Sequence, residues 1–114
     1  MSYDVWLEKD GEICRVNPHI EGGTVMIGGS PKAEMSVTYN YSEVYYLFGF
    51  TLKSLDGKKA GYVVEELGEL VHKLGTKEYK RDYWAPTPGN AGHALNVLLG
   101  WALLNPDATF RVEA

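Results

Sequence analysis

Three features are scarce in this 114-residue sequence: cysteine, histidine and long apolar runs. The lone Cys14 excludes an internal disulfide and a cysteine-based zinc site. His19, His72 and His93 stand in unrelated contexts without metal-ligand spacing. No apolar run approaches the roughly 20 residues that cross a membrane, and residues 1–6 lack the basic start and apolar core of a signal peptide. We therefore expect a soluble, cytoplasmic protein with no cofactor, no metal and no membrane contact.

Positive charge is also in short supply. The chain has 11 Lys and Arg against 15 Asp and Glu, a net charge of −4, and its cations are scattered. Nucleic-acid binders usually gather theirs into a basic stripe, so we expect no direct nucleic-acid binding. The acidic balance either serves solubility or suits a basic partner, including by imitation of a phosphate backbone.

Catalytic patterns are missing as well. Cys14 has no recognisable nucleophile motif around it. Glu65, Glu66 and Glu69 are close in sequence, but such a run of carboxylates is typical of a hydrated helix face. We predict that the protein is not an enzyme, and an enzyme of unknown type is the alternative.

The first half of the chain has the patterns of β-structure. Alternation and turn residues predict strands over four ranges, namely 3–9, 12–16, 24–27 and 35–41. Between the first two stands Asp10-Gly11, a dipeptide that accepts positive φ in a two-residue hairpin turn. The aromatic segment 43–53 either continues the sheet or lines a packed loop.

The second half predicts two helices and a closing strand. Apolar residues repeat at helical spacing over 60–74, and Gly75 suits a left-handed cap. Thr87 is placed to cap a second helix over 88–104, and residues 109–113 alternate as a strand. We therefore predict one α+β domain covering all 114 residues. Its architecture is an antiparallel sheet of four or five strands with two helices on one face, in the order strands, helix, helix, strand.

The stretch before the second helix combines features of a ligand site. It joins aromatic residues and glycines to a helix N-terminus, whose N–H groups and partial positive charge suit an anion. A small nucleotide-like ligand would contact Tyr83, Trp84, Thr87, Gly89, Asn90, Gly92 and His93. The spacing matches no phosphate-binding fingerprint. The alternative is a rigid loop that starts a helix, with Trp84 packed beneath it.

Five other residues are candidates for an interface with a protein: Trp6, Tyr45, Tyr46, Val97 and Leu104. Trp6 lies on the otherwise acidic side of its strand, whereas Val97 and Leu104 fall outside the apolar stripe of the second helix. Tyr45 and Tyr46 belong to an aromatic run that is either a recognition surface or part of the core. The partner is then another protein, or a second copy of the chain in a homodimer.

Several segments resemble small bacteriophage- and prophage-encoded proteins of undescribed activity. These segments are 21–24, 28–29, 37–41, 83–92 and 105–108. The resemblance brings no catalytic residue. It implies a phage accessory protein that acts by stoichiometric binding, such as an inhibitor of a host defence or nucleic-acid-processing protein. We therefore expect a non-enzymatic binding protein, with binding or sequestering of a nucleotide-like ligand as the alternative function.

Overall fold

The sheet is organised around its longest strand, β1. The computed structural model describes residues 2–16, 24–26, 32–75 and 85–114, and five strands occur in these parts of the chain. They are β1 (Ser2–Lys9), β2 (Glu12–Ile13), β3 (Thr24–Met26), β4 (Glu34–Thr38) and β5 (Thr109–Glu113). β1 pairs antiparallel with β2, β4 and β5, while β3 pairs antiparallel with β4. The predicted antiparallel sheet is confirmed.

β1 is an interior strand because its residues pair on both edges. Val5 stands opposite Met35 of β4 on one edge and opposite Val112 of β5 on the other, and all three side chains are buried. The predicted turn follows β1, since Asp10 and Gly11 have φ values of 54° and 80°. The alternation in the sequence therefore identifies the face of β1 that meets the core.

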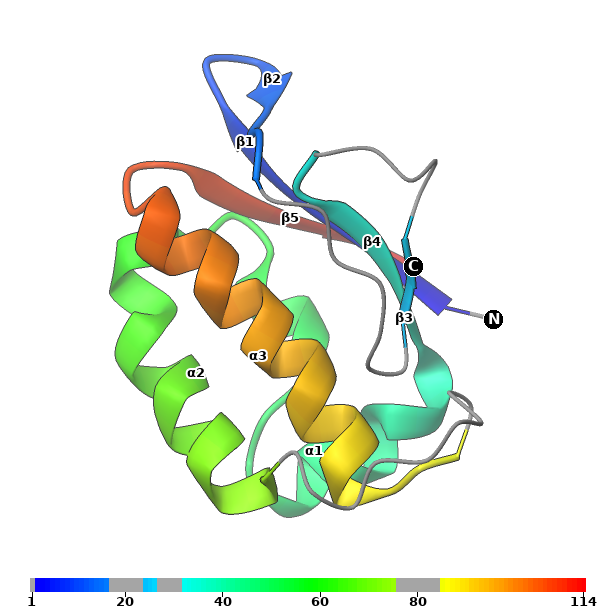
Figure 1. Cartoon of the computed structure of the whole chain (residues 1–114). Helices are drawn as coiled ribbons and strands as arrows, with labels where there is room; N and C mark the ends of the chain where they lie inside the picture. The colour runs from blue at the N-terminus through cyan, green and yellow to red at the C-terminus, as the bar shows by residue number, and fades with distance from the viewer. Residues whose placement is uncertain (1, 17–23, 27–31, 76–84) are drawn as a thin grey trace.

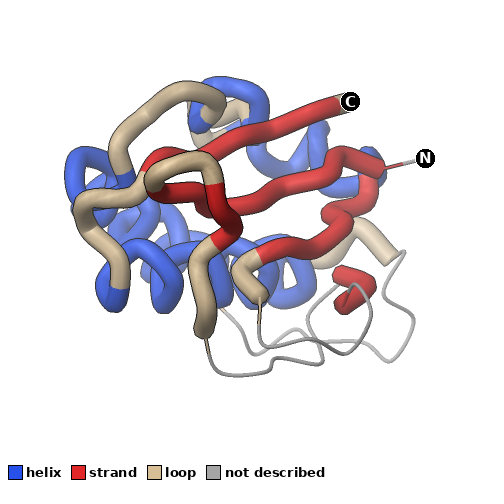
Figure 2. The backbone as a smooth tube through the Cα atoms, turned by 90° about the horizontal axis from the view of Figure 1, so that it is seen from above, coloured by secondary structure: helices blue, strands red, loops and turns tan. Residues whose placement is uncertain are grey.

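Two long helices cover one face of the sheet. They are α2 (Ala60–Leu74) and α3 (Pro88–Leu104), which pack against each other beneath the strands (Figure 1). Figure 2 shows the same two layers from above, with the strands lying over the helices. Both spans match the prediction, and the expected apolar stripe of α3 is fully buried, namely Ala91, Ala94, Leu95, Leu98 and Ala102. The α+β class and the one-sided helical layer are thus confirmed.

The segment after β4 is helical, which corrects the sequence interpretation. The prediction continues a strand through residue 41 and treats 43–53 as sheet or loop. The structure instead has η2 (Tyr39–Tyr41), α1 (Ser42–Leu47) and η3 (Leu52–Leu55). β4 ends early because the Thr38 hydroxyl accepts a hydrogen bond from the Asn40 N–H at 3.2 Å and caps the new turn. Gly49, with a φ of 73°, then redirects the chain from α1 toward η3.

The residues after η3 cover the edge of β5 that β1 leaves open. The Gly57 N–H donates to the Phe110 carbonyl at 2.8 Å, and the Phe110 N–H donates to the Lys58 carbonyl at 2.9 Å. Farther along the strand, Asp56 Oδ1 accepts a hydrogen bond from the Val112 N–H at 3.0 Å. Such cover blocks pairing with another strand. It also fixes η3 against the sheet, which matters for the site below.

Candidate binding pocket

The predicted ligand loop uses its polar side chains within the fold. The Thr87 hydroxyl accepts a hydrogen bond from the Asn90 N–H at 3.1 Å, so the expected cap is present. Asn90 is fully buried, and its side-chain amide donates to the Ala85 carbonyl at 3.0 Å. Tyr83 and Trp84 lie outside the described residues. Thr87 and Asn90, two of the residues proposed to hold a ligand, therefore stabilise the first turn of α3.

One of the two glycines of that loop, Gly92, serves helix packing. Gly89 and Gly92 are both buried. A Cβ atom on Gly92 would overlap the carbonyl oxygen of Gly75, the residue that ends α2, and would lie 3.1 Å from Cβ of Leu74. Glycine at position 92 therefore lets α3 approach the end of α2. His93, the last residue proposed for the ligand, is half-buried on the same turn.

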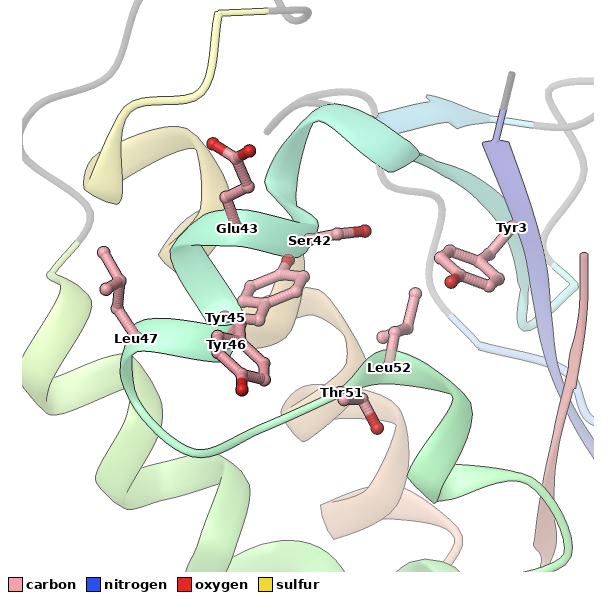
Figure 3. Close-up of a pocket in the computed structure, with 8 residues that line it drawn as sticks. All are labelled: Tyr3, Ser42, Glu43, Tyr45, Tyr46, Leu47, Thr51 and Leu52. Carbon is pink, nitrogen blue, oxygen red and sulfur yellow. The ribbon is translucent and has the colours of Figure 1, made fainter.

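A pocket of about 490 Å³ lies at a different corner, where α1 meets β1 and η3. Eight residues line it: Tyr3, Ser42, Glu43, Tyr45, Tyr46, Leu47, Thr51 and Leu52. In Figure 3 the two α1 tyrosines occupy the centre, Tyr3 comes from β1, and the side chain of Leu52 rises between them from η3. The volume is within the range of small-ligand and side-chain pockets.

Helical spacing builds the inner wall of this pocket. Tyr41 and Tyr45 are four residues apart, both are buried, and their rings pack edge to face with centroids 6.1 Å apart. The Tyr45 ring also packs on Phe50 at 5.6 Å, and its hydroxyl donates to the carbonyl of Ala91 in α3 at 3.0 Å. Burial raises the pKa of Tyr45 well above its usual value, so this hydroxyl stays protonated as a donor. Tyr45 thereby attaches α1 to α3.

The next three residues carry their side chains to the surface. Tyr46 is 75% exposed, Leu47 82% and Phe48 40%. Single exposed apolar residues are common on protein surfaces. Three exposed apolar residues in succession are unusual, and two of them, Tyr46 and Leu47, also line the largely apolar hollow. We call residues 46–48 the apolar rim.

The opposite wall is fixed by β1 and η3. The rings of Tyr3 and Tyr39 pack edge to face at 4.6 Å, and Leu52 is almost fully buried. The end of η3 is held by Asp56, whose carboxylate accepts from the Val112 N–H and lies 3.3 Å from Nε of Arg111. These bonds lower the pKa of Asp56 below its usual value, the bond from Val112 most of all. This wall is therefore preformed.

The lining combines apolar surface with a few hydrogen-bonding groups. Its polar groups are the hydroxyls of Ser42 and Thr51, the tyrosine hydroxyls and one carboxylate, that of Glu43. None of the eight lining residues is a histidine, cysteine or lysine.

The structure distributes the five predicted interface residues among different environments. Trp6 is half-buried, and its Nε1–H donates to Glu8 Oε2 at 3.1 Å within the same strand. Val97 is half-buried against the core, whereas Leu104 is 65% exposed at the end of α3. Tyr45 is 2% exposed and packs in the core, as the alternative interpretation expects, although it also lines the pocket. Tyr46 alone of the five is an exposed residue of the pocket.

Six lining residues were not identified from the sequence: Tyr3, Ser42, Glu43, Leu47, Thr51 and Leu52. One available signal was the spacing of Tyr41 and Tyr45, which puts both on one side of a helix and turns Tyr46 away from it. The meeting of Tyr3 with Leu52 had no such signal, because it depends on how β1 and η3 pack.

The remaining reactive groups are dispersed. Burial raises the pKa of the half-buried Cys14 thiol, which disfavours the thiolate. His72 is exposed on α2, and His19 lies outside the described residues. Within the described part of the chain, no three His, Cys, Asp or Glu residues gather as metal ligands would. In the same part, no helix has the length and apolar character needed to cross a bilayer.

Comparison with family models, with curated proteins and with solved structures gave no match. The pocket and its rim are therefore the features of the molecule that bear on function.

Proposed function

We propose that this protein acts by binding another protein, and that the α1 pocket with its apolar rim receives an apolar side chain of the partner. The observation that carries the proposal is the succession of Tyr46, Leu47 and Phe48 on the surface beside a hollow of about 490 Å³. Protein interfaces concentrate their binding energy in aromatic and aliphatic anchors that fill such hollows.

The rim favours a protein over an isolated small molecule. A small ligand is enclosed over most of its surface by its pocket. Here Leu47 and Tyr46 remain largely exposed, 82% and 75%, and extend the apolar surface outward from the hollow. Water is displaced from such a rim only by a second surface laid across it, as a protein partner provides.

The proposed role is stoichiometric and non-enzymatic. It is supported by a lining whose side chains offer contact and hydrogen bonds but include no histidine, cysteine or lysine. The resemblance to phage accessory proteins suggests inhibition of a host defence or nucleic-acid-processing protein as the biological use. The nucleotide-like ligand is less favoured, because among the described residues of its predicted site Thr87, Asn90 and Gly92 are engaged within the fold.

The test is capture of a partner by wild-type protein and by two rim variants. Tagged protein is incubated with lysate of the cells in which it is naturally made, and a partner present in stoichiometric amount is identified by mass spectrometry. Tyr46→Ala and Leu47→Ala should each reduce the captured amount about tenfold, as loss of an interface anchor does. Both side chains are exposed, so the fold should be unaffected.

Matched controls come from a different surface. Tyr62→Ala on α2 and Leu103→Ala on α3 remove the same side-chain types from positions that are 82% and 60% exposed. These variants should capture the partner as the wild type does. A partner retained by both rim variants, or lost equally with Tyr62→Ala and Leu103→Ala, contradicts the proposal.

A further inference from the structure

The charge at the edge of the pocket specifies the partner further. This inference rests on the proposed function, because it concerns what enters the same pocket. We infer that the partner presents a large apolar side chain with an arginine or lysine directly beside it in the same segment. The volume of the pocket, the charge of Glu43 and the exposed ring of Tyr46 each contribute to this assignment.

Glu43 is the only charged residue among the eight that line the pocket. Its carboxylate points away from the rings of Tyr45 and Tyr46, so it lies at the edge rather than in the floor (Figure 3). An apolar anchor in the hollow would thus leave the carboxylate beside a neighbouring residue of the partner. A cation at that neighbouring position gains electrostatic attraction, and an anion is repelled.

The cations of η3 and β5 do not neutralise this carboxylate. Lys53 donates to the Val112 carbonyl at 2.8 Å and lies 4.0 Å from Asp56, and Arg111 lies 3.3 Å from the same aspartate. Among the described residues, the ion pairs present all involve Asp56 and none involves Glu43. The Glu43 carboxylate and the net charge of −4 of the chain both favour a basic segment of the partner at the edge of the pocket.

Tyr46 favours the same partner for a second reason. Its ring is 75% exposed and lines the pocket that Glu43 also lines. The face of an exposed tyrosine attracts a guanidinium or ammonium group, and its body packs against an aromatic anchor. An arginine or lysine beside an aromatic or leucine anchor can therefore contact the ring of Tyr46.

The probe for this inference is a random peptide library displayed on phage and selected on immobilised wild-type protein. Enriched sequences should place a tryptophan, phenylalanine or leucine within one or two residues of an arginine or lysine. One enriched peptide is then synthesised in two forms, with its basic residue intact and with glutamine in its place. The dissociation constant of each form is measured by calorimetry for the wild type and each variant.

The variants separate the two parts of the pocket. Leu47→Ala should weaken both peptides about tenfold, because both share the anchor. Glu43→Gln should weaken the basic peptide about two- to fivefold, leave the glutamine peptide unchanged and flatten the salt dependence. Glu69→Gln removes an equal charge from the exposed face of α2 and should change the dissociation constant of neither peptide. Charge reversal in Glu43→Lys should weaken the basic peptide by about tenfold or more.

The outcomes distinguish the inference from the function on which it rests. If Leu47→Ala weakens the peptides but Glu43→Gln affects both forms equally or not at all, the basic neighbour is wrong and the pocket stands. Enriched peptides without basic residues lead to the same conclusion. If Leu47→Ala and Tyr46→Ala leave every enriched peptide unaffected, or if no sequence is enriched, both the inference and the proposed function are contradicted.

Discussion

The corner where α1 meets β1 and η3 (the α1 corner) and the first turn of α3 are joined by a hydrogen bond. They differ in whether their side chains contact the protein's own fold or the solvent. The Tyr45 hydroxyl of the corner donates to the Ala91 carbonyl of the turn. At the turn, Asn90 and Gly92 are buried and engaged with neighbouring backbone. At the corner, Tyr46 and Leu47 extend into solvent. A helix start rich in glycine and polar residues is thus occupied by its own fold, whereas an unremarkable aromatic run supplies the open surface.

The largest expected loss of stability tests whether the first turn of α3 is closely packed against α2. Gly92→Ala places a methyl group against the backbone of Gly75 and should lower the free energy of unfolding by about 3 kcal/mol, since that backbone cannot move aside cheaply. Gly100→Ala, in the same helix with no atom near its Cβ, should instead gain up to about 1 kcal/mol. Urea denaturation measures both. Equal stability of Gly92→Ala and wild type would show that the turn has room for a ligand.

The adjacent tyrosines Tyr45 and Tyr46 compare a buried side chain with an exposed one within the α1 corner. Tyr45→Phe removes a buried hydroxyl bonded to Ala91 and should cost about 1.5 kcal/mol of unfolding free energy. Tyr46→Phe should stay within about 0.5 kcal/mol of wild type, because its ring is mostly exposed. The same denaturation experiment compares them. A cost for Tyr46→Phe as large as that for Tyr45→Phe would mean that Tyr46 belongs to the core.

Two threonines provide a matched comparison between the regions. Thr87→Ala removes the cap of α3 and should cost about 1 kcal/mol, whereas Thr87→Ser should retain most of it. Thr51 precedes η3 and makes no side-chain capping bond there, so Thr51→Ala should cost less than about 0.5 kcal/mol. Thermal and urea unfolding check both values. If Thr87→Ala were neutral, its hydroxyl would be available to a ligand after all.

The smallest effect concerns the wall of the pocket and depends on pH. The pKa of Asp56 is lowered in the fold, chiefly by the bond from Val112, from an ordinary value of 3.8. Its contribution to stability is therefore complete above pH 3.8 and is lost as the pH falls through the lower folded pKa. The stability gap between wild type and Asp56→Asn should be largest near pH 6 and shrink toward about pH 2. A gap that widens on acidification would contradict this assignment.

Local signals predicted most of the fold. The alternation around Val5, the positive-φ dipeptide after β1 and the spacing over 60–74 each involve neighbours in sequence. The helical structure of segment 39–47 was not predicted, because its tyrosines suit either a strand or a turn of helix. The hydrogen bond to the Thr38 hydroxyl favours the helical turn over the strand. Secondary-structure propensities take no account of such a single hydrogen bond.

The candidate site was less accessible to sequence reasoning. Tyr46 was identified because it belongs to an aromatic run, and tyrosine is favoured at protein interfaces. The pairing of Tyr3 with Leu52 across the hollow arises from tertiary packing, which has no local pattern. Gly92 is ambiguous in the sequence for a physical reason, because close approach of a ligand and close approach of a helix demand the same residue.

The most direct test of the account is amide chemical-shift mapping of the isotope-labelled protein with one enriched peptide. If the α1 pocket is the binding surface, the largest shifts should fall on residues 42–48 and 51–52, with small changes over 87–93. Shifts concentrated over 87–93, with the corner unchanged, would contradict the central claim and return the binding site to the start of α3.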